Sequence, residues 1–225
     1  MVAVVAHPDD AELLCYGTLR RAVAAGATVT VVVVTHGANG VSVVDAAGGR
    51  RLDTDERAKE VRAAWRGTGI HLAFLCLPDG ALVADRDLIS AVEAELSGLG
   101  CTLLITHSLN AATDHQDHQA LARAAANAAT RVDTCHTVLH GEPHAPRSAF
   151  SPTVVVDITD HLHAKVTALA AHSTQAGRWY LGKDYTHHRA AQAAWRLRPT
   201  AAGAGRAYES FETSLLTLFP QEDRP

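Results

Sequence analysis

Two short polar stretches contain the residues whose types and spacing could do chemistry. Residues 6–12 read AHPDDAE, and residues 107–118 read HSLNAATDHQDH. Neighbouring carboxylates repel each other, so the adjacent Asp9 and Asp10 are unfavourable unless a cation lies between them or each has a different task. By itself, either stretch is also compatible with a turn or with a helix start that an aspartate caps. Whether the two act together depends on whether the fold brings them to one place.

The chemistry that such residues offer is metal-assisted hydrolysis. Zinc accepts imidazole nitrogen and carboxylate oxygen, and catalytic zinc sites use three protein ligands with water in the open position. One histidine and one aspartate from the first stretch, with one histidine from the second, would complete such a set. The metal lowers the pKa of its water to about 7. A remaining carboxylate could then act as the base, and a remaining histidine could stabilise the oxyanion or protonate the leaving group.

Apolar, strand-like runs alternate with helical patterns along most of the chain. The expected strands are residues 2–6, 28–35, 71–78, 101–107, 137–140 and 153–159, and the expected helices are residues 13–25, 54–65, 87–99, 118–131 and 161–175. Successive strand–helix units imply right-handed crossovers and a mainly parallel sheet. We therefore expect an α/β fold, a single-domain, three-layer Rossmann-like sandwich with helices on both faces of the sheet.

This architecture predicts where the two polar stretches lie. Residues 1–225 are expected to form one domain, in which residues 178–225 are an irregular tail that caps the active site. Sheets of this kind bind ligands beyond the carboxyl ends of their strands. The two stretches follow the first and fourth strands, so they should face the same crevice. In that setting one aspartate can bind metal while its neighbour handles protons.

Composition excludes several classes of function. Hydrophobic residues make up 47% of the 225 residues and charged residues 20%, as in ordinary globular proteins. The net charge of −4 and the pI near 6.4 argue against a nucleic-acid partner or an anionic membrane surface. Apolar runs fall far short of the ~20 residues that span a bilayer, and no secretory leader precedes the first strand. A cytoplasmic protein without membrane insertion is the expectation.

The two stretches together resemble the signature of the PIG-L/LmbE family of zinc-dependent N-acetylglucosaminyl deacetylases. That signature is AHPDD with a glutamate close behind, followed by an HxDH element, and both occur here in order. The resemblance continues in four further segments, namely RAKE (57–60), LPDGAL (77–82), VDITDHLHAKVTALAAHSTQ (156–175) and AYESFE (207–212). It implies a hydrolase that removes the N-acetyl group from an N-acetylglucosamine-type amino sugar in a small conjugate, in natural-product or thiol-cofactor biosynthesis.

Carried over by position, the resemblance implies a metal site and a base. His7, Asp10 and His118 would hold one Zn²⁺ per chain, and Asp9 would be the general base. Fe²⁺ or another first-row divalent metal would also suit this ligand set. The implied partner is a small N-acetylated amino-sugar conjugate, and the sequence leaves a homo-oligomer open.

The resemblance also implies roles for residues around the metal. His115 would be the acid or the electrophile, with Asp117 holding it in orientation. Arg57 and Asp79 fall where related enzymes contact substrate. The alternative for Arg57 is a solvated pair with Glu60, one turn further along a helix, and the alternative for Asp79 is an ordinary turn residue.

The chain departs from the family pattern at two places. Thr113 stands where some members carry a tyrosine that polarises the amide carbonyl, so that role would fall to His115 or to another group. Tyr16 and Gly17 stand where related proteins tend to have two glycines, which would narrow the floor of the pocket. Among the other histidines, His107 is a candidate for orienting a carboxylate of the site.

Two other functions remain open from the sequence. One is an amidase of a larger amide, such as a thiol conjugate. The other is a non-catalytic carbohydrate-binding protein. The presence of Asp9 and His115 disfavours it, because a protein that only binds sugar needs no base beside a metal. A phosphoesterase generally needs two metals, and the sequence offers ligands for one.

Overall fold

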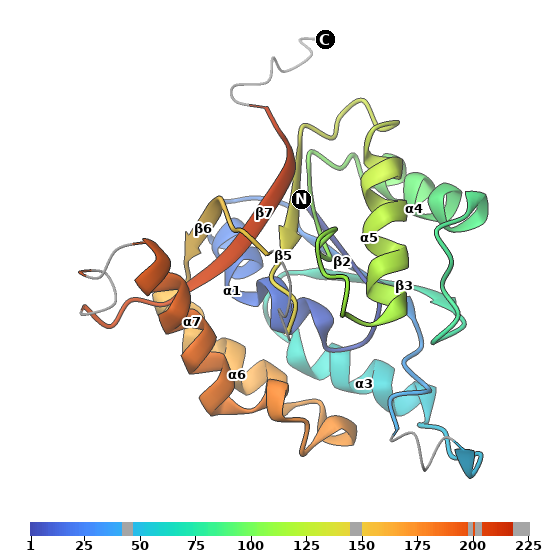
Figure 1. The fold of residues 1–225 in the computed structure, drawn as a ribbon, viewed down its shortest axis with the longest axis horizontal. Coiled ribbons are helices and arrows are strands. Elements are labelled where there is room, and N and C mark those ends of the chain that lie inside the picture. Colours follow the sequence, from blue (N-terminus) through green and yellow to red (C-terminus); the bar gives the residue numbers. More distant parts are fainter. Residues whose placement is uncertain (42–46, 145–149, 198–199, 201–203, 218–225) are drawn as a thin grey trace.

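The computed structural model describes residues 1–41, 47–144, 150–197, 200 and 204–217. A single sheet runs through the centre of this part of the chain, and helices lie on either side of it (Figure 1). The strands are β1 (Val2–Val5), β2 (Thr30–Thr35), β3 (His71–Leu77), β4 (Leu103–Thr106), β5 (Thr137–Gly141), β6 (Val154–Asp157) and β7 (Tyr208–Leu216). The α-helices are α1 (Asp10–Ala24), α3 (Thr54–Ala64), α4 (Arg86–Gly98), α5 (Gln116–Ala129), α6 (Leu162–Ala170) and α7 (Lys183–Leu197). The 3₁₀ helices are η1 (Thr159–His161), η2 (Ser173–Gln175) and η3 (Trp179–Leu181).

The sheet is mainly parallel, with the order β3-β2-β1-β4-β5-β7-β6. The five strands from β3 to β5 pair in parallel, whereas β7 pairs antiparallel with both β5 and β6. This confirms the predicted α/β sandwich. The parallel half places five strand ends along one edge, which is where the sequence predicts the site.

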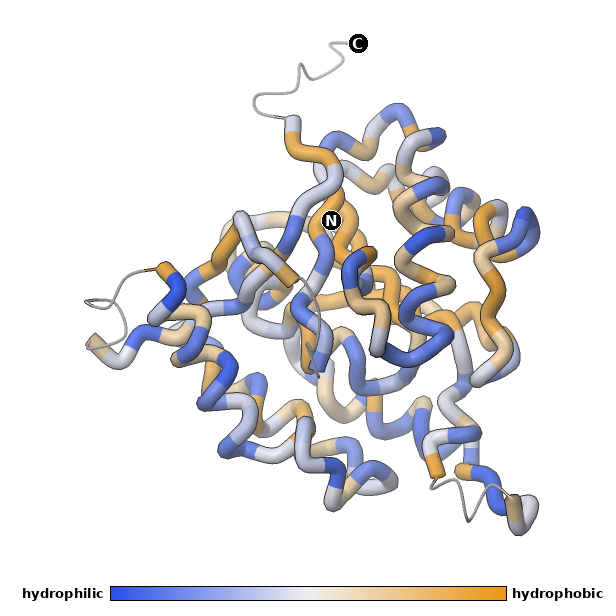
Figure 2. The backbone as a smooth tube through the Cα atoms, in the orientation of Figure 1, coloured by the Kyte–Doolittle hydropathy of each residue, from blue (hydrophilic) through white to orange (hydrophobic). Residues whose placement is uncertain are grey.

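Two hydrophobic layers hold the helices against the sheet. On one face Val4, Val32 and Leu104 pack with α4 and α5. On the other face the next residues along the same strands pack with α1, α3 and α6. β1 and β2 are buried throughout because both faces are covered, which explains their unbroken apolar sequence. Figure 2 shows these central strands as the most hydrophobic part of the molecule.

The C-terminal part of the chain differs from the expected irregular tail. Residues 183–197 form α7, and residues 208–216 form β7, which lies inside the sheet between β5 and β6. Four consecutive residues of β7, Glu209 to Glu212, are buried, and most of them are polar. A strand with buried polar side chains lacks the apolar run that predicts a strand. Residues 218–225 of the expected tail lie outside the described residues.

The predicted helix over residues 161–175 is interrupted. It consists of η1, α6 and η2, with a break after Ala170. The short η2 turn brings Ser173 and Thr174 against Glu60 of α3, and Gln175 against the loop after β2. No helix among the described residues has the length and apolar character needed to cross a membrane.

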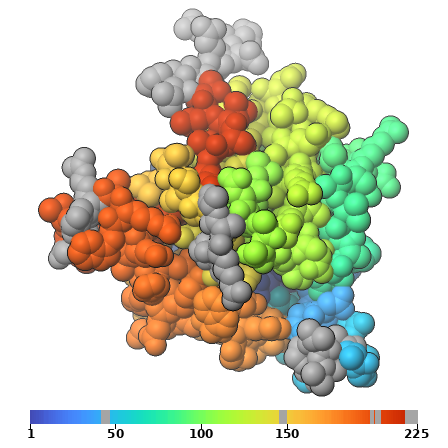
Figure 3. Space-filling view, viewed as in Figure 1, coloured from blue at the N-terminus to red at the C-terminus, as the bar shows by residue number. Residues whose placement is uncertain are grey.

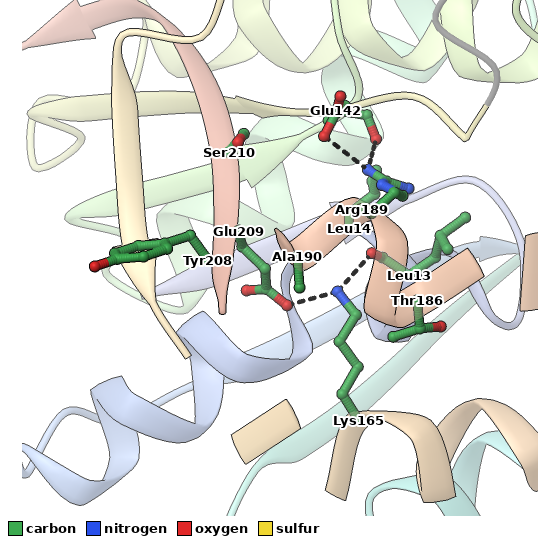
Figure 4. Close-up of a pocket in the computed structure, with 10 residues that line it drawn as sticks. All are labelled: Leu13, Leu14, Glu142, Lys165, Thr186, Arg189, Ala190, Tyr208, Glu209 and Ser210. Carbon is green, nitrogen blue, oxygen red and sulfur yellow. Dashed lines mark hydrogen bonds and ion pairs between the residues drawn. The ribbon is translucent and has the colours of Figure 1, made fainter. Parts of the chain in front are cut away.

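A kink in α1 is stabilised by a buried ion pair (Figure 4). The helix breaks at Cys15, whose φ is −147°. Lys165 donates to the Leu13 carbonyl at 2.8 Å and to Glu209 at 2.7 Å, and Glu209 accepts from the N–H and the hydroxyl of Thr18. The pair thus satisfies backbone groups that the break leaves without helical partners. It also fixes the direction of the first turn of α1, which begins at the site.

Candidate active site

The two polar stretches meet at the carboxyl edge of the sheet. They follow β1 and β4, which are neighbouring parallel strands. Asp9 has a φ of 114° at the start of α1, an unfavourable conformation for a residue with a side chain. The Asp10 carboxylate accepts the His7 backbone N–H at 2.7 Å. This turn gives the two adjacent carboxylates different partners.

Three side-chain atoms form a close triangle at the base of this edge. His7 Nδ1 lies 3.3 Å from Asp10 Oδ2, His118 Nε2 lies 3.2 Å from the same oxygen, and the two nitrogens are 3.0 Å apart. Ligand atoms of tetrahedral zinc at about 2.0–2.1 Å are about 3.3 Å from one another. Two imidazole nitrogens and one carboxylate oxygen in this arrangement fit a single divalent cation.

A fourth nearby nitrogen, which could otherwise bind a metal, already accepts a hydrogen bond. His107 Nε2 lies 3.5 Å from Asp10 Oδ2, but the Ala6 backbone N–H donates to that nitrogen at 3.0 Å. Its lone pair is therefore occupied. The ring stacks on that of His118 with centroids 4.1 Å apart, and burial lowers the pKa of His107 to about 3, so this imidazole is neutral.

Carboxylates contact the outer nitrogens of both triangle histidines. His7 Nε2 lies 3.2 Å from Asp79 Oδ1 and 3.2 Å from Asp117 Oδ2. His118 Nδ1 lies 3.0 Å from Asp114 Oδ1. Such contacts fix the tautomer and orientation of metal-binding histidines. Burial opposes charge here, yet Asp10 and Asp114 raise the pKa of His118 to about 9. The cluster therefore stabilises positive charge at this point.

Asp117 contacts His115 through its backbone, and its carboxylate binds other groups. Its carboxylate oxygens accept the backbone N–H groups of Gly80 and Leu82 and contact His7. The backbone N–H of Asp117 donates to His115 Nδ1 at 3.2 Å. This bond leaves the His115 ring proton on Nε2, so the exposed imidazole can donate a hydrogen bond into the pocket.

Arg57 lies against the first loop rather than free in the pocket. Its guanidinium is 3.2 Å from Asp9 Oδ2, contacts the Pro8 carbonyl and lies 3.3 Å from Glu60 Oε2. The side chain is 2% exposed. The pair with Glu60 therefore exists but is buried, not solvated. Burial raises the pKa of Asp9 and Arg57 opposes that rise.

Asp79 has defined partners, and so does Tyr16, one of the residues at which the chain departs from the family pattern. The Asp79 carboxylate accepts the Asn39 backbone N–H at 2.6 Å, in addition to its contact with His7. Tyr16 packs on Trp65, with ring centroids 4.7 Å apart. The Tyr16 side chain of α1 packs into the hydrophobic core and is not among the residues that line the cavity. It therefore does not narrow the floor of the pocket.

A cavity of about 420 Å³ opens above the triangle, within the usual range for small-molecule sites. Loops after β1, β2, β3, β4 and β5 contribute to it, as does the segment before α7. Its lining residues are His7, Asp9, Asp10, Gly37, Asn39, Gly40, Val41, Arg57, Asp79, Thr113, Asp114, His115, His118, His144, Gln175, Arg178 and Tyr180. On the face shown in Figure 3, the orange segment that contains α6 and α7 approaches the green residues near α5.

Sequence reasoning missed several of these lining residues. His144 follows β5 in a proline-rich loop, and Tyr180 lies in η3 within the segment expected to be irregular. The available signal was the run RWY at residues 178–180, an aromatic pair beside a cation in a polar region. His172, by contrast, lies beneath the site, with Nε2 3.2 Å from Glu12 Oε1.

Fold and site together define a class of enzymes: α/β proteins that gather histidine and aspartate side chains at the carboxyl edge of a parallel sheet. The model of the PIG-L family, described as GlcNAc-PI de-N-acetylase, matches residues 2–129. The chain belongs to this family and is an N-deacetylase.

Individual relatives agree with this assignment. Over 237 residues the chain is 27% identical to 1D-myo-inositol 2-acetamido-2-deoxy-alpha-D-glucopyranoside deacetylase 1 of Saccharopolyspora erythraea, covering 80% of this chain and 78% of that protein. The fold is similar to that of N,N'-diacetylchitobiose deacetylase from Pyrococcus horikoshii, with a TM-score of 0.79 and 18% identity over 95% of this chain and 83% of that chain.

The same fold also occurs with a different reaction. GalB, the 4-carboxy-2-hydroxymuconate hydratase of Pseudomonas putida, superposes with a TM-score of 0.79 and 21% identity over 98% of each chain. A fold alone therefore does not set the chemistry. The reaction must be argued from the family and from the side chains of the site.

Proposed function

We propose that the protein is a metal-dependent hydrolase that removes the N-acetyl group from an N-acetylglucosamine-type amino sugar in a small conjugate. The observation that carries this proposal is the triangle of His7, Asp10 and His118 beneath the cavity, with Asp9 beside it but engaged elsewhere. The name of the Saccharopolyspora relative supports the substrate class, because its substrate is an acetamido sugar joined to inositol.

The triangle would hold one divalent metal. Zn²⁺ is the first candidate because two imidazole nitrogens and one carboxylate are ligands it accepts, and Fe²⁺ or another first-row ion tolerates the same set. Such a metal supplies a Lewis acid that lowers the pKa of a water molecule and polarises the acetyl carbonyl. Asp79 and Asp117 orient His7, and Asp114 orients His118.

The chain's own groups then move the protons. Asp9 accepts a proton from the water that attacks the acetyl carbonyl, and it later returns that proton to the nitrogen of the departing amine. Arg57 holds the Asp9 carboxylate in place during both transfers. His115 donates its Nε2 proton as a hydrogen bond to the carbonyl oxygen, on which negative charge develops. The products are acetate and a free amino sugar.

The test is a panel of N-acetylglucosamine conjugates offered to zinc-loaded protein, with free amine and acetate measured separately. The proposal predicts equal amounts of the two products from at least one conjugate, and a large loss of both in the Asp9→Asn variant. A metal-loaded protein that binds the conjugates but releases neither product would instead be a carbohydrate-binding protein. Activity confined to larger acyl groups would indicate an amidase of another amide.

A further inference from the structure

Three aromatic side chains form a continuous strip that begins at the metal-ligand triangle and ends at the surface. The His144 ring lies 6.2 Å from that of His118, measured between centroids. Tyr180 lies 4.4 Å from His144, and Trp179 lies 5.7 Å from Tyr180. His144 and Tyr180 line the cavity, and Trp179 is 60% exposed. We call His144, Tyr180 and Trp179 the aromatic strip.

The aromatic strip is held in position by neighbouring residues. Tyr185 donates its hydroxyl proton to the His144 carbonyl, and its ring packs edge-on against Trp179 with centroids 4.8 Å apart. The Arg189 guanidinium lies over the Tyr185 ring at 5.7 Å. η3 and the start of α7 therefore present the rings before any ligand arrives. A preformed surface loses little conformational entropy when a ligand covers it.

Most of the other lining residues of the cavity are polar. Asn39, Asp79 and Arg57 line it, together with the backbone around Gly40. Arg178 donates to the Gly40 carbonyl at 2.9 Å, which ties the segment of the aromatic strip to the loop after β2. A ligand in this cavity thus meets both polar groups and the rings of His144 and Tyr180.

The direction of the substrate follows from the chemistry. The acetamide must reach the triangle at the base of the cavity, so the group attached to the far side of the sugar extends toward the surface. His144 and Tyr180 line the cavity that this group must pass, and Trp179 lies beside Tyr180. Aromatic surfaces recognise flat apolar groups by stacking and by removing apolar area from water. A small polar substituent would leave the exposed Trp179 ring uncovered.

We propose that the aromatic strip binds the aglycone of the acetamido sugar and selects conjugates whose aglycone presents an aromatic or similarly flat apolar face. This inference rests on the proposed function, since it extends the substrate beyond the sugar. Tyr180 contributes stacking area within the cavity, and Trp179 contributes it on the exposed surface beside Tyr180. The Tyr180 hydroxyl has no hydrogen-bond partner within the described part of the chain, so its contribution to binding can be measured separately.

The experiment compares phenyl and methyl glycosides of N-acetylglucosamine, with both anomers of each. Their Kd values are measured by calorimetry on the zinc-loaded Asp9→Asn variant, in which turnover is expected to be slow, and kcat/KM is measured on the otherwise unchanged enzyme. We expect the phenyl glycoside to bind roughly tenfold more tightly than the methyl glycoside. Trp179→Ala should remove most of this preference while leaving the Kd of the methyl glycoside unchanged.

Two further variants show whether stacking is the cause. Trp195→Ala is the matched control, because Trp195 is also 60% exposed but lies on α7, whereas Trp179 packs against Tyr180 and His144. It should keep the full phenyl preference. Tyr180→Phe should keep it as well, since the ring remains. A preference that survives Trp179→Ala, or that disappears in Tyr180→Phe alone, would overturn the assignment to stacking.

The failure of this inference is distinguishable from that of the proposed function. Deacetylation of both glycosides with equal kcat/KM and equal Kd would overturn the role of the aromatic strip and leave the deacetylase intact. Tight, Trp179-dependent binding of the phenyl glycoside without release of acetate would support the role of the aromatic strip and overturn the proposed deacetylase function. Absence of binding by both glycosides would overturn the role of the aromatic strip.

Discussion

The guanidinium of Arg57 lies 3.2 Å from the carboxylate of Asp9, and both side chains are withdrawn from solvent. This contact gives Arg57 a role that differs from the substrate contact expected from its motif. It places the Arg57 cation directly beside the Asp9 carboxylate. The adjacent aspartates are therefore tolerated because each faces positive charge of its own: Arg57 for Asp9, and the histidine cluster for Asp10.

Removal of Arg57 should affect turnover more than substrate binding. In Arg57→Ala, we expect kcat to fall by about 10- to 100-fold, because Asp9 loses the group that positions it. KM and zinc content should change little. The variant should also lose about 3 kcal/mol of unfolding free energy, since Glu60 is left as a buried charge without its cation. Arg66→Ala, exposed just beyond α3, is the control. A rise in KM with unchanged kcat would restore Arg57 to direct substrate contact.

Asp117 should control the affinity for metal although it is not expected to bind the metal. In Asp117→Asn, the contact that fixes His7 weakens, and we predict a 10- to 100-fold loss of zinc affinity, the usual effect of changing such a partner. Competition with a chromogenic chelator measures this loss. Asp133→Asn, away from the cluster, should have wild-type affinity. If Asp117→Asn bound zinc normally but lost activity, the orientation of His115 would again be the better account of this residue.

The Glu60 carboxylate should make the free energy of unfolding depend on pH in the acidic range. Burial would raise its pKa, but hydrogen bonds from Thr174 and Ser173 and the charge of Arg57 bring the pKa below the ordinary value of 4.5. A lowered folded-state pKa stabilises the protein above about pH 4.5, and this contribution is lost as the pH falls through the folded-state value. Urea unfolding of Glu60→Gln should therefore show a smaller loss of stability between pH 7 and pH 3 than wild type. An equal loss in both proteins would contradict this.

The kink in α1 should depend on the Lys165–Glu209 ion pair. Lys165→Met leaves the Leu13 carbonyl without its donor and Glu209 without its cation, so we expect a loss of about 3 kcal/mol in unfolding free energy. Lys183→Met, at the exposed start of α7, should change stability by less than about 0.5 kcal/mol. In a double-mutant cycle, Lys165→Met should cost much less when Glu209 is already glutamine. Additive effects would show that the two residues act independently.

The extent to which the sequence predicts this protein varies with the kind of residue. The apolar runs of β1 and β2 and the polar stretches that follow β1 and β4 were sufficient to predict the parallel sheet and the edge that carries the site. They failed for β7, because Glu209 and Glu212 are buried by partners far away in the sequence. The contacts of the Asp117 carboxylate were not predicted for a similar reason. Its neighbour in sequence is His115, but the start of α5 turns its carboxylate toward the loop after β3 and toward His7.

The aromatic strip shows a further limit of sequence reasoning. His144 and Tyr180 are separated by 35 intervening residues, and neither belongs to a motif. They meet because β5 and η3 both end beside the cavity, a consequence of tertiary packing that no local pattern contains. Residues that bind metal are constrained in type and spacing, whereas residues that shape the mouth of a pocket are not.

The central claim is that Asp10 binds the metal while the neighbouring Asp9 moves the proton. Zinc content and kcat of Asp9→Asn and Asp10→Ala, measured on the same preparations, test it most directly. We predict that Asp10→Ala loses both metal and activity. Asp9→Asn should keep about one zinc per chain while kcat falls by roughly 10²–10⁴-fold, the usual cost of removing a general base. An Asp9→Asn protein that is free of metal, or that turns over at the wild-type rate, would contradict this division of roles.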